Sequence, residues 1–302
     1  MGFIAATGPA LSVNVPGSFI SDSWPQLALL GDGSAVATHR YIAQGNFQVA
    51  LTTLNRDATR VTDRSDADAG GRGQRNDTDV AALEGGGFAV TWPELTQTGP
   101  VVFEIRARAF DAEGRPAGPA FEAFGDIDFN GVVFGIAPVE GGGFAVLGSN
   151  SGAGFLRVFD ADGTPRTDSL SVAALTSRAD ADLYPFAGGL LAAVDFGTRS
   201  YDLFDRRGRL VETELRADIG GVPAGRPAMI PLDHERTLMA GVVGNQLRAQ
   251  ILGPDGAPIG GAIEVSEAGD ADDGSPELTH LSDGSVLVSW IVRPDGDAPW
   301  IE

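Results

Sequence analysis

One short sequence word recurs six times along the chain, and a chain with such a repeat is expected to fold into near-equivalent units. The word is a glycine- or aspartate-rich turn followed by an alternating apolar strand. Its copies begin at Gly31, Gly85, Gly141, Gly188, Asp233 and Asp283. The strand positions Ser34, Phe88, Phe144, Leu190, Thr237 and Ser285 are separated by 54, 56, 46, 47 and 48 residues.

A second word follows each of the first five copies. It consists of an apolar residue, a tight acidic turn and another strand, and the turn usually contains a glycine where a positive φ is needed. Its copies are Leu54–Asp57, Phe110–Gly114, Phe159–Gly163, Phe204–Gly208 and Leu252–Gly256. We interpret each as a hairpin turn. The Asp160–Gly163 turn is not half of a calcium loop, because it lacks the downstream glutamate and a sibling turn carries Arg206 and Arg207.

Four short antiparallel strands every 45 to 55 residues are typical of β-propeller blades. With 42 Gly and 18 Pro, the chain is also too rich in turn residues for a helical bundle. We therefore predict an all-β fold, a six-bladed β-propeller with four antiparallel strands per blade, in one domain over residues 1–302. The expected blades span approximately residues 20–75, 76–125, 126–175, 176–220, 221–270, and 271–302 together with 1–15.

The last repeat has room for only one strand after Trp290, so its outer strand is missing. The alternating segment Ala10–Val15 precedes the first repeat and is predicted to complete that blade. Such closure removes an open sheet edge. A solenoid of the same repeats would need polar caps at both ends, and we find none.

The repeat words resemble those of a known group of proteins. Leu83–Trp92 together with Ile105–Gly114 is similar to repeats in large secreted or surface proteins of marine alphaproteobacteria, often found beside hemolysin-type calcium-binding modules. The resemblance covers most of the chain and is weakest in the fourth and fifth repeats. It implies a propeller-like, non-enzymatic surface module. The Gly-Gly-x-Gly-x-Asp array of the calcium-binding modules is absent from this sequence.

Charge and composition limit the partners. The chain has 41 acidic and 21 basic residues, all of the latter arginine, for a net charge of -20. This charge disfavours nucleic acid and anionic membranes as partners.

No apolar run approaches a membrane span and no charged leader is visible at Met1–Asn14, so we expect no membrane insertion. Cysteine is absent, which excludes disulfides. The expected location is extracellular or on a cell or virion surface.

Aspartates recur just before the innermost strand of each blade. Equivalent positions in a propeller form a ring, so these carboxylates are predicted to surround one mouth of the central channel. Such a ring offers oxygen ligands for Ca²⁺. The alternative is that each aspartate caps nearby backbone N–H groups at a strand start. The proposed ligands are Asp77, Asp79, Asp126, Asp128, Asp180, Asp182, Asp270 and Asp272.

Four tryptophans divide into two pairs. Trp92 and Trp290 occupy equivalent repeat positions and are predicted to pack between blades. Trp24 and Trp300 have no equivalents, and each adjoins a proline, so we predict that they form a stacking surface for a sugar.

Three functions remain open from the sequence. The leading hypothesis is a non-catalytic binding or adhesion module that recognises a glycan or surface protein through loops on one propeller face. The first alternative is a hydrolase or lyase that uses carboxylates or a metal at the channel mouth. The second is a structural subunit whose propeller mediates assembly. All three rest on the fold expectation.

Overall fold

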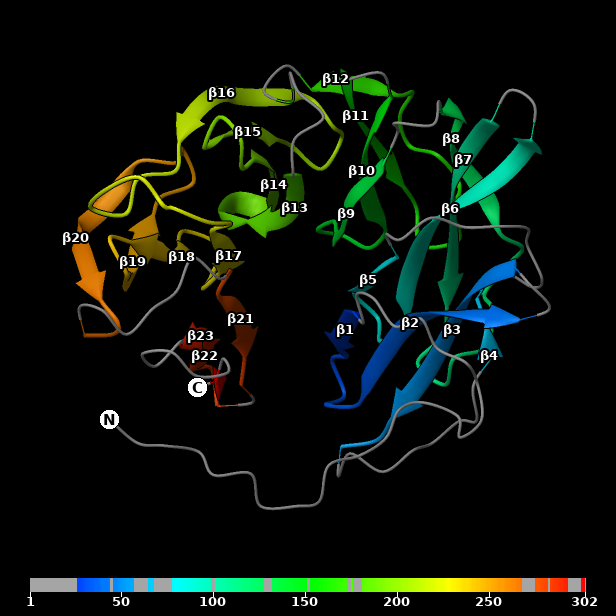
Figure 1. The fold of residues 1–302 in the computed structure, drawn as a ribbon, viewed down its shortest axis with the longest axis horizontal. Coiled ribbons are helices and arrows are strands. Elements are labelled where there is room, and N and C mark those ends of the chain that lie inside the picture. The colour runs from blue at the N-terminus through cyan, green and yellow to red at the C-terminus, as the bar shows by residue number, and fades with distance from the viewer. Residues whose placement is uncertain are drawn as a thin grey trace.

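The fold is all-β, as Figure 1 shows for the computed structural model. The structure describes residues 26–43, 46–56, 65–67, 78–98, 101–127, 132–150, 153–172, 175, 181–267, 275–281, 283–292 and 300–301. Within these residues, no helix has both the length and the apolar character needed to cross a membrane.

Five four-stranded antiparallel sheets follow one another along the chain, and in each the strands pair in sequence order. Sheet 1 contains β1 (Gln26–Leu29), β2 (Ala35–Ala43), β3 (Asn46–Leu54) and β4 (Ser65–Asp66). Sheet 2 contains β5 (Asp79–Ala82), β6 (Phe88–Thr98), β7 (Val101–Phe110) and β8 (Phe121–Ile127). Sheet 3 contains β9 (Val132–Pro138), β10 (Phe144–Asn150), β11 (Ala153–Phe159) and β12 (Leu170–Val172). Sheet 4 contains β13 (Ala181–Phe186), β14 (Leu190–Asp195), β15 (Ser200–Phe204) and β16 (Leu210–Arg216). Sheet 5 contains β17 (Ala228–Pro231), β18 (Thr237–Val243), β19 (Gln246–Leu252) and β20 (Pro258–Glu264). The prediction of four antiparallel strands per repeat is confirmed for these five sheets.

The sixth repeat is described as two strand pairs. β21 (Glu277–His280) pairs with β22 (Val286–Ser289), and β23 (Ile291–Val292) pairs with β24 (Trp300–Ile301). The predicted closing strand, Ala10–Val15, lies outside the described residues.

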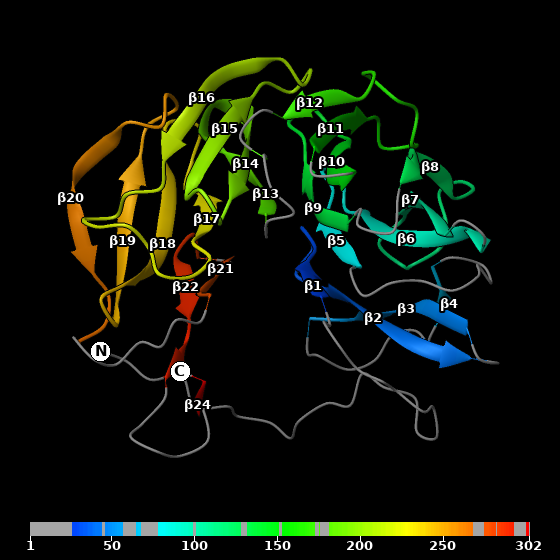
Figure 2. The same cartoon turned by 45° about the horizontal axis from the view of Figure 1, so that its top comes forward.

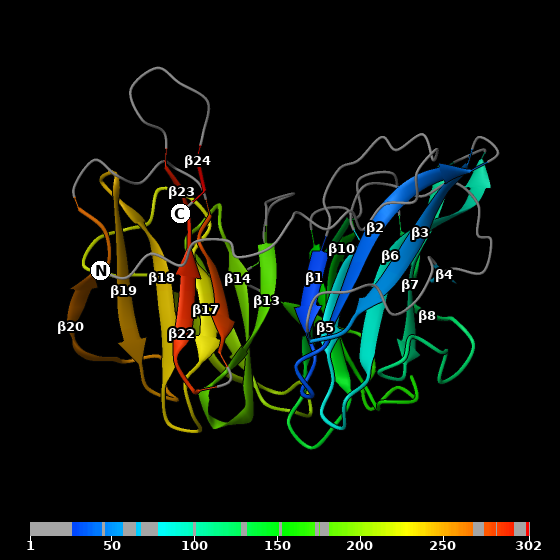
Figure 3. The ribbon, with the colours of Figure 1, turned by 90° about the horizontal axis from the view of Figure 1, so that it is seen from below.

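The sheets are arranged around a common centre. The first strands β1, β5, β9, β13, β17 and β21 each contact the next in this series, and Figures 1 and 2 show them on the inner side of an arc of sheets. Figure 3, seen from below, brings sheet 1 and the β21–β22 pair to the front of the molecule. This is a propeller-like arrangement.

Burial changes from strand to strand outward through a sheet. The second strands β10 and β18 are buried at every position except the last. The outer strand β20 is exposed along its whole length, and β16 is exposed except at one position. A strand is buried on both faces only when another sheet covers each face, so the sheets stack face to face near the centre.

The hydrophobic core is divided among the spaces between neighbouring sheets. Four clusters join sheets 1 and 2, 2 and 3, 3 and 4, and 4 and 5. Trp92 is fully buried in the first of them, with Val36 and Val49 of the adjacent sheet. Trp290 packs against Val242 and Leu247. The prediction that these two tryptophans pack between neighbouring repeats is therefore confirmed.

The third glycine of the Gly-Gly-Gly turn is required by a close backbone contact. A Cβ added at Gly87 would lie 2.3 Å from the carbonyl oxygen of Phe110, and one at Gly143 would lie 2.2 Å from that of Phe159. The phenylalanine after each turn stacks on the same partner, with ring centroids 5.0 Å apart for Phe88 and Phe110. Glycine thus lets the turn close onto the end of the third strand.

Replacing this glycine tests that contact. We expect Gly87→Ala to lower the free energy of unfolding by about 1–3 kcal/mol, because the added methyl group overlaps a backbone oxygen that cannot rotate away. The control is Gly31→Ala, where no atom lies within 4 Å of the added Cβ and φ is not in the left-handed region. Urea unfolding of both variants measures the difference. Equal free energies of unfolding for the two variants would contradict the requirement for glycine at this contact.

Candidate functional site

Most of the predicted site residues lie outside the described part of the chain. Trp24, Asp77, Asp128, Asp180, Asp270 and Asp272 are not described. Asp126 lies in β8 and Trp300 in β24, but their side chains are not described. The sugar-stacking role of the two tryptophans therefore stays a prediction. Asp79 and Asp182 are described with their side chains, and we call them the inner carboxylate pair.

The two members of the inner carboxylate pair converge on one peptide unit of the strand between them. Asp79 begins β5 and Asp182 lies in β13, and β9 contacts both strands. Asp79 Oδ2 accepts a hydrogen bond from the N–H of Ile136 at 3.0 Å. A Cβ added at Gly135 would lie 2.5 Å from Asp182 Oδ1, so Gly135 leaves the space that this carboxylate occupies.

Each carboxylate also caps its own strand. Asp79 Oδ1 accepts a hydrogen bond from the N–H of Val80 at 2.8 Å, and Asp182 Oδ1 accepts one from the N–H of Leu183 at 2.7 Å. This is the capping role that the sequence offered as the alternative to a metal site.

Burial raises the pKa of both members of the pair. Desolvation is the largest cause for Asp79, and the hydrogen bonds from Ile136 and Val80 oppose it. Desolvation is also the largest cause for Asp182, and the negative charge of Asp79 raises this pKa further. Two like charges so placed resist ionising together. The pair therefore gives up its protons at higher pH than isolated aspartates.

Three further ionisable groups lie near the pair, and sequence analysis identified none of them. Burial raises the pKa of Tyr184 and of Glu277, and Asp182 raises the tyrosine pKa further. The Tyr184 hydroxyl donates a hydrogen bond to the carbonyl oxygen of Pro227 at 3.3 Å. Arg226 supplies the opposing positive charge to Asp182 and Glu277.

A metal centre does not emerge from the described residues. Among them, no group of three or more His, Asp or Glu side chains is arranged to hold a metal ion. The predicted ring of calcium ligands stays a prediction for the aspartates that lie outside the described residues. Asp79 instead connects β5 to β9 by a hydrogen bond, and Asp182 of β13 packs against Gly135 of β9.

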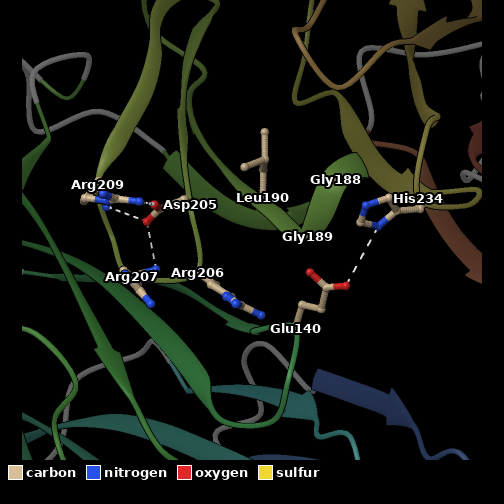
Figure 4. Close-up of a pocket in the computed structure, with 9 residues that line it drawn as sticks. All are labelled: Glu140, Gly188, Gly189, Leu190, Asp205, Arg206, Arg207, Arg209 and His234. Carbon is tan, nitrogen blue, oxygen red and sulfur yellow. Dashed lines mark hydrogen bonds and ion pairs between the residues drawn. The ribbon is translucent and has the colours of Figure 1, made fainter.

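A cavity of about 510 Å³ lies at the opposite end of the inner strands, and Figure 4 shows its lining. We call it the turn pocket. It is formed by hairpin turns of three successive sheets, and its lining residues are Glu140 from sheet 3; Gly188, Gly189, Leu190, Asp205, Arg206, Arg207 and Arg209 from sheet 4; and His234 from sheet 5.

The charged groups of the turn pocket are unequally paired. Arg209 Nη2 lies 2.7 Å from Asp205 Oδ2, and His234 Nδ1 lies 3.9 Å from Glu140 Oε1. Arg206 and Arg207 are exposed, and no described acidic side chain forms an ion pair with either. The pocket thus presents three guanidinium groups and a histidine against two carboxylates.

The pocket opens where a pair of hydrogen bonds between neighbouring turns is not repeated. One sheet earlier, Glu84 Oε2 accepts hydrogen bonds from the N–H groups of Gly141 and Gly142, each at 3.0 Å. Glu140 is the repeat equivalent of Glu84, but the N–H of Gly188 in the next turn donates to the carbonyl oxygen of His234 instead. Glu140 therefore faces the pocket.

The turn pocket was not predicted from the sequence, because Arg206 and Arg207 were interpreted only as evidence against a calcium loop. The available signal was their departure from the repeat, since the matching positions of the second turn are Ala112 and Glu113. No sequence pattern placed His234 near that turn.

Comparison with known proteins gives the fold. No protein-family model matches the chain, and no curated protein matches it. A protein of unknown function from Dyadobacter fermentans DSM 18053 is 13% identical, with 93% of each chain covered and a TM-score of 0.55. A catalytically inactive virginiamycin B lyase from Staphylococcus aureus is 10% identical, with 96% of this chain and 94% of the lyase covered and a TM-score of 0.51. AofleA from Arthrobotrys oligospora is 8% identical, with 92% of this chain and 81% of AofleA covered and a TM-score of 0.52. These likenesses support a propeller-like all-β fold.

The raised pKa values of the inner carboxylate pair predict that the stability of the fold depends on pH. A carboxyl group whose pKa is raised on folding stabilises the fold most at low pH, and its contribution is lost as the pH rises toward the folded-state pKa. We expect unfolding free energy to fall above pH 5 and Asp182→Asn to reduce that fall. At pH 8.5 the free energy of unfolding of the variant should exceed that of the unmodified protein by at least about 1.4 kcal/mol, the equivalent of one pKa unit.

Denaturant unfolding between pH 5 and 9 measures this effect. Asp168→Asn, at an exposed position between β11 and β12, is the control and should follow the unmodified protein. Parallel curves for Asp182→Asn and the unmodified protein would show that the pair is not a source of the pH dependence.

Proposed function

We propose that this protein is a non-catalytic binding module, extracellular or displayed on a cell or virion surface, and that it binds a glycan in the turn pocket. The observation that carries the proposal is the pocket itself: turns from three successive sheets line an open pocket of about 510 Å³. This volume is within the range of about 300–1,000 Å³ that small-molecule sites occupy.

The lining of the turn pocket favours binding over catalysis. Among its described lining residues there is no serine, threonine or tyrosine to act as a nucleophile. Its histidine lies 3.9 Å from Glu140, beyond hydrogen-bonding distance, and no third group orients it. What remains is charge, hydrogen-bonding capacity and the apolar side chain of Leu190, which together suit recognition of a polar ligand.

The inner carboxylate pair supports catalysis less than it supports structure. Its raised pKa values are a property shared by catalytic acids. However, the oxygens of Asp79 and Asp182 already accept hydrogen bonds from Val80, Ile136 and Leu183. A carboxylate that caps strands in this way is held by the fold, so we favour a structural role for the pair.

We infer that the ring is closed with six blades. Leu27 and Leu29 of β1 are 67% and 48% exposed, although β1 occupies an inner position. The inner strands β5, β13 and β17 have no exposed position, whereas β21, at the other end of the series, is exposed at three of its four positions. The exposed edges of β1 and β21 therefore favour contact between the first and last blades. Ala10–Val15 would then supply the outer strand of the β21–β22 sheet.

The pocket proposal is tested by filling the cavity. We expect the protein to bind at least one saccharide on a glycan array, and His234→Trp to weaken this binding at least about tenfold, or 1.4 kcal/mol. His234 is 72% exposed, so the larger ring should enter the pocket without disturbing the core. Glu235→Trp places the same ring on the adjacent exposed residue and should bind normally.

Isothermal titration calorimetry with the saccharide found on the array gives the dissociation constants of the unmodified protein and of both variants. Equal weakening in both variants, or the absence of any saccharide hit, would refute glycan binding at the turn pocket.

The closure proposal is tested by truncation. Deleting residues 1–15 should lower the melting temperature by roughly 5 °C or more and promote association, because the last blade would lose a strand and expose an edge. Deleting residues 1–6 leaves Ala10–Val15 in place and should change the melting temperature little. Scanning calorimetry with light scattering measures both effects. Unchanged melting of the longer deletion would exclude closure by this segment.

A further inference from the structure

The β15–β16 turn departs from its repeat equivalents in one direction. Its second variable position carries arginine where all the other copies carry an acidic residue, and its first carries arginine, which otherwise occurs only in the first copy, as Arg56. The equivalent turns are Asn55–Asp57, Asp111–Gly114, Asp160–Gly163, Asp205–Gly208 and Gly253–Gly256. On a chain of net charge -20, two adjacent changes toward positive charge at one turn need an explanation.

Folding of the turn does not explain the arginines. Asp205 Oδ1 accepts hydrogen bonds from the N–H groups of Arg207 and Arg209 at 2.8 and 2.9 Å. In sheet 2, Asp111 Oδ1 accepts from the N–H groups of Glu113 and Arg115 at 3.1 and 2.8 Å. The same skeleton thus forms with glutamate at the second position, so neither guanidinium is needed to build it.

Local ion pairing does not explain them either. In the sheet 2 turn, Arg115 contacts both Asp111 and Glu113. In the sheet 4 turn, Asp205 is already paired with Arg209, and the guanidinium groups of Arg206 and Arg207 have no acidic partner among the described residues. Figure 4 shows Arg206 extending from its turn toward the side of the pocket that carries Glu140.

The opposite wall of the pocket offers hydrogen-bond acceptors. Glu140 is the equivalent of Glu84, whose carboxylate is occupied by two backbone N–H groups. No described backbone N–H group donates to Glu140, its side chain is 46% exposed, and its Oε1 lies 3.9 Å from His234 Nδ1. An ionised carboxylate accepts hydrogen bonds only, so a ligand that meets Glu140 must bring donors such as hydroxyl groups.

We infer that the turn pocket binds an anionic saccharide, with its acidic group on Arg206 and Arg207 and its hydroxyl groups on Glu140. This inference rests on the proposed glycan-binding function and specifies its substrate class. Guanidinium groups bind carboxylates and sulfates through charge-assisted, often paired hydrogen bonds. An acidic peptide would bring fewer donors to Glu140, and a neutral saccharide would leave the two arginines without a partner.

The experiment compares saccharides of equal length that differ in their acidic group. The probes are a galacturonic acid trisaccharide, its fully methyl-esterified form, and a sulfated trisaccharide of the same length, each titrated calorimetrically into the full chain. We expect the acid to bind at least about tenfold more tightly than its ester. Tighter binding of the sulfated probe than of the acid would identify sulfate as the preferred acidic group and support the inference equally.

The matched variant restores the turn of sheet 2. Arg206→Ala/Arg207→Glu gives the residues found at Ala112 and Glu113, on a skeleton known to accept them. We expect it to fold with an unchanged melting temperature and to bind the acid and the ester equally weakly. The control Ala112→Arg/Glu113→Arg adds the same charge to the sheet 2 turn and should bind as the unmodified protein does.

Three outcomes would overturn the inference. Equal affinity of the unmodified protein for acid and ester would refute charge recognition while leaving glycan binding intact. Enhanced binding by the control variant would show that net charge, not the turn pocket, attracts the anion. Failure of all three probes to bind, with a neutral saccharide positive on the array, would overturn the anionic class alone.

Discussion

The interaction on which the structure depends is the packing of one sheet face against the next. Each of the four main hydrophobic clusters contains residues of two neighbouring sheets, and the second strands are buried on both sides. A sheet with two apolar faces needs a neighbour on each. Repeating that requirement along the chain leads to a ring or a stack, and the inner strands curve around a common centre (Figure 1).

Face-to-face packing leaves the turns free to vary. The glycine that contacts the carbonyl oxygen of the third strand is present in sheets 2 and 3 as Gly87 and Gly143, whereas sheet 5 has Arg236 before Thr237 and forms its turn differently. Neighbouring turns then meet side by side. Where a glutamate bridges two of them, as Glu84 does, the face is closed. Where the bridge is not repeated, at Glu140, a pocket remains.

The features that the sequence predicted are those encoded within one repeat. The Gly-Gly-Gly turns, the Asp turns and the burial of Trp92 follow from local spacing, and the structure contains all three. Recurrence also placed Asp79 and Asp182 near the starts of inner strands, where the structure has them. The peptide that receives both carboxylates, at Gly135 and Ile136, was not predictable, because it depends on the lateral register of three sheets. The same is true of His234 beside Glu140.

The two sites lie at opposite ends of the same inner strands, and this separates their effects. Asp182 is the second residue of β13, whereas Gly188 follows the end of that strand. The four steps of extended chain from Asp182 to Phe186 alone span roughly 13 Å, which is beyond the distance at which surface charges interact strongly in physiological salt. Substitutions more than about 10 Å apart without shared partners act nearly independently. We therefore expect protonation of the inner carboxylate pair to change the stability of sheets 2 to 4, and substitutions of the arginines in the turn pocket to leave that pH dependence unchanged.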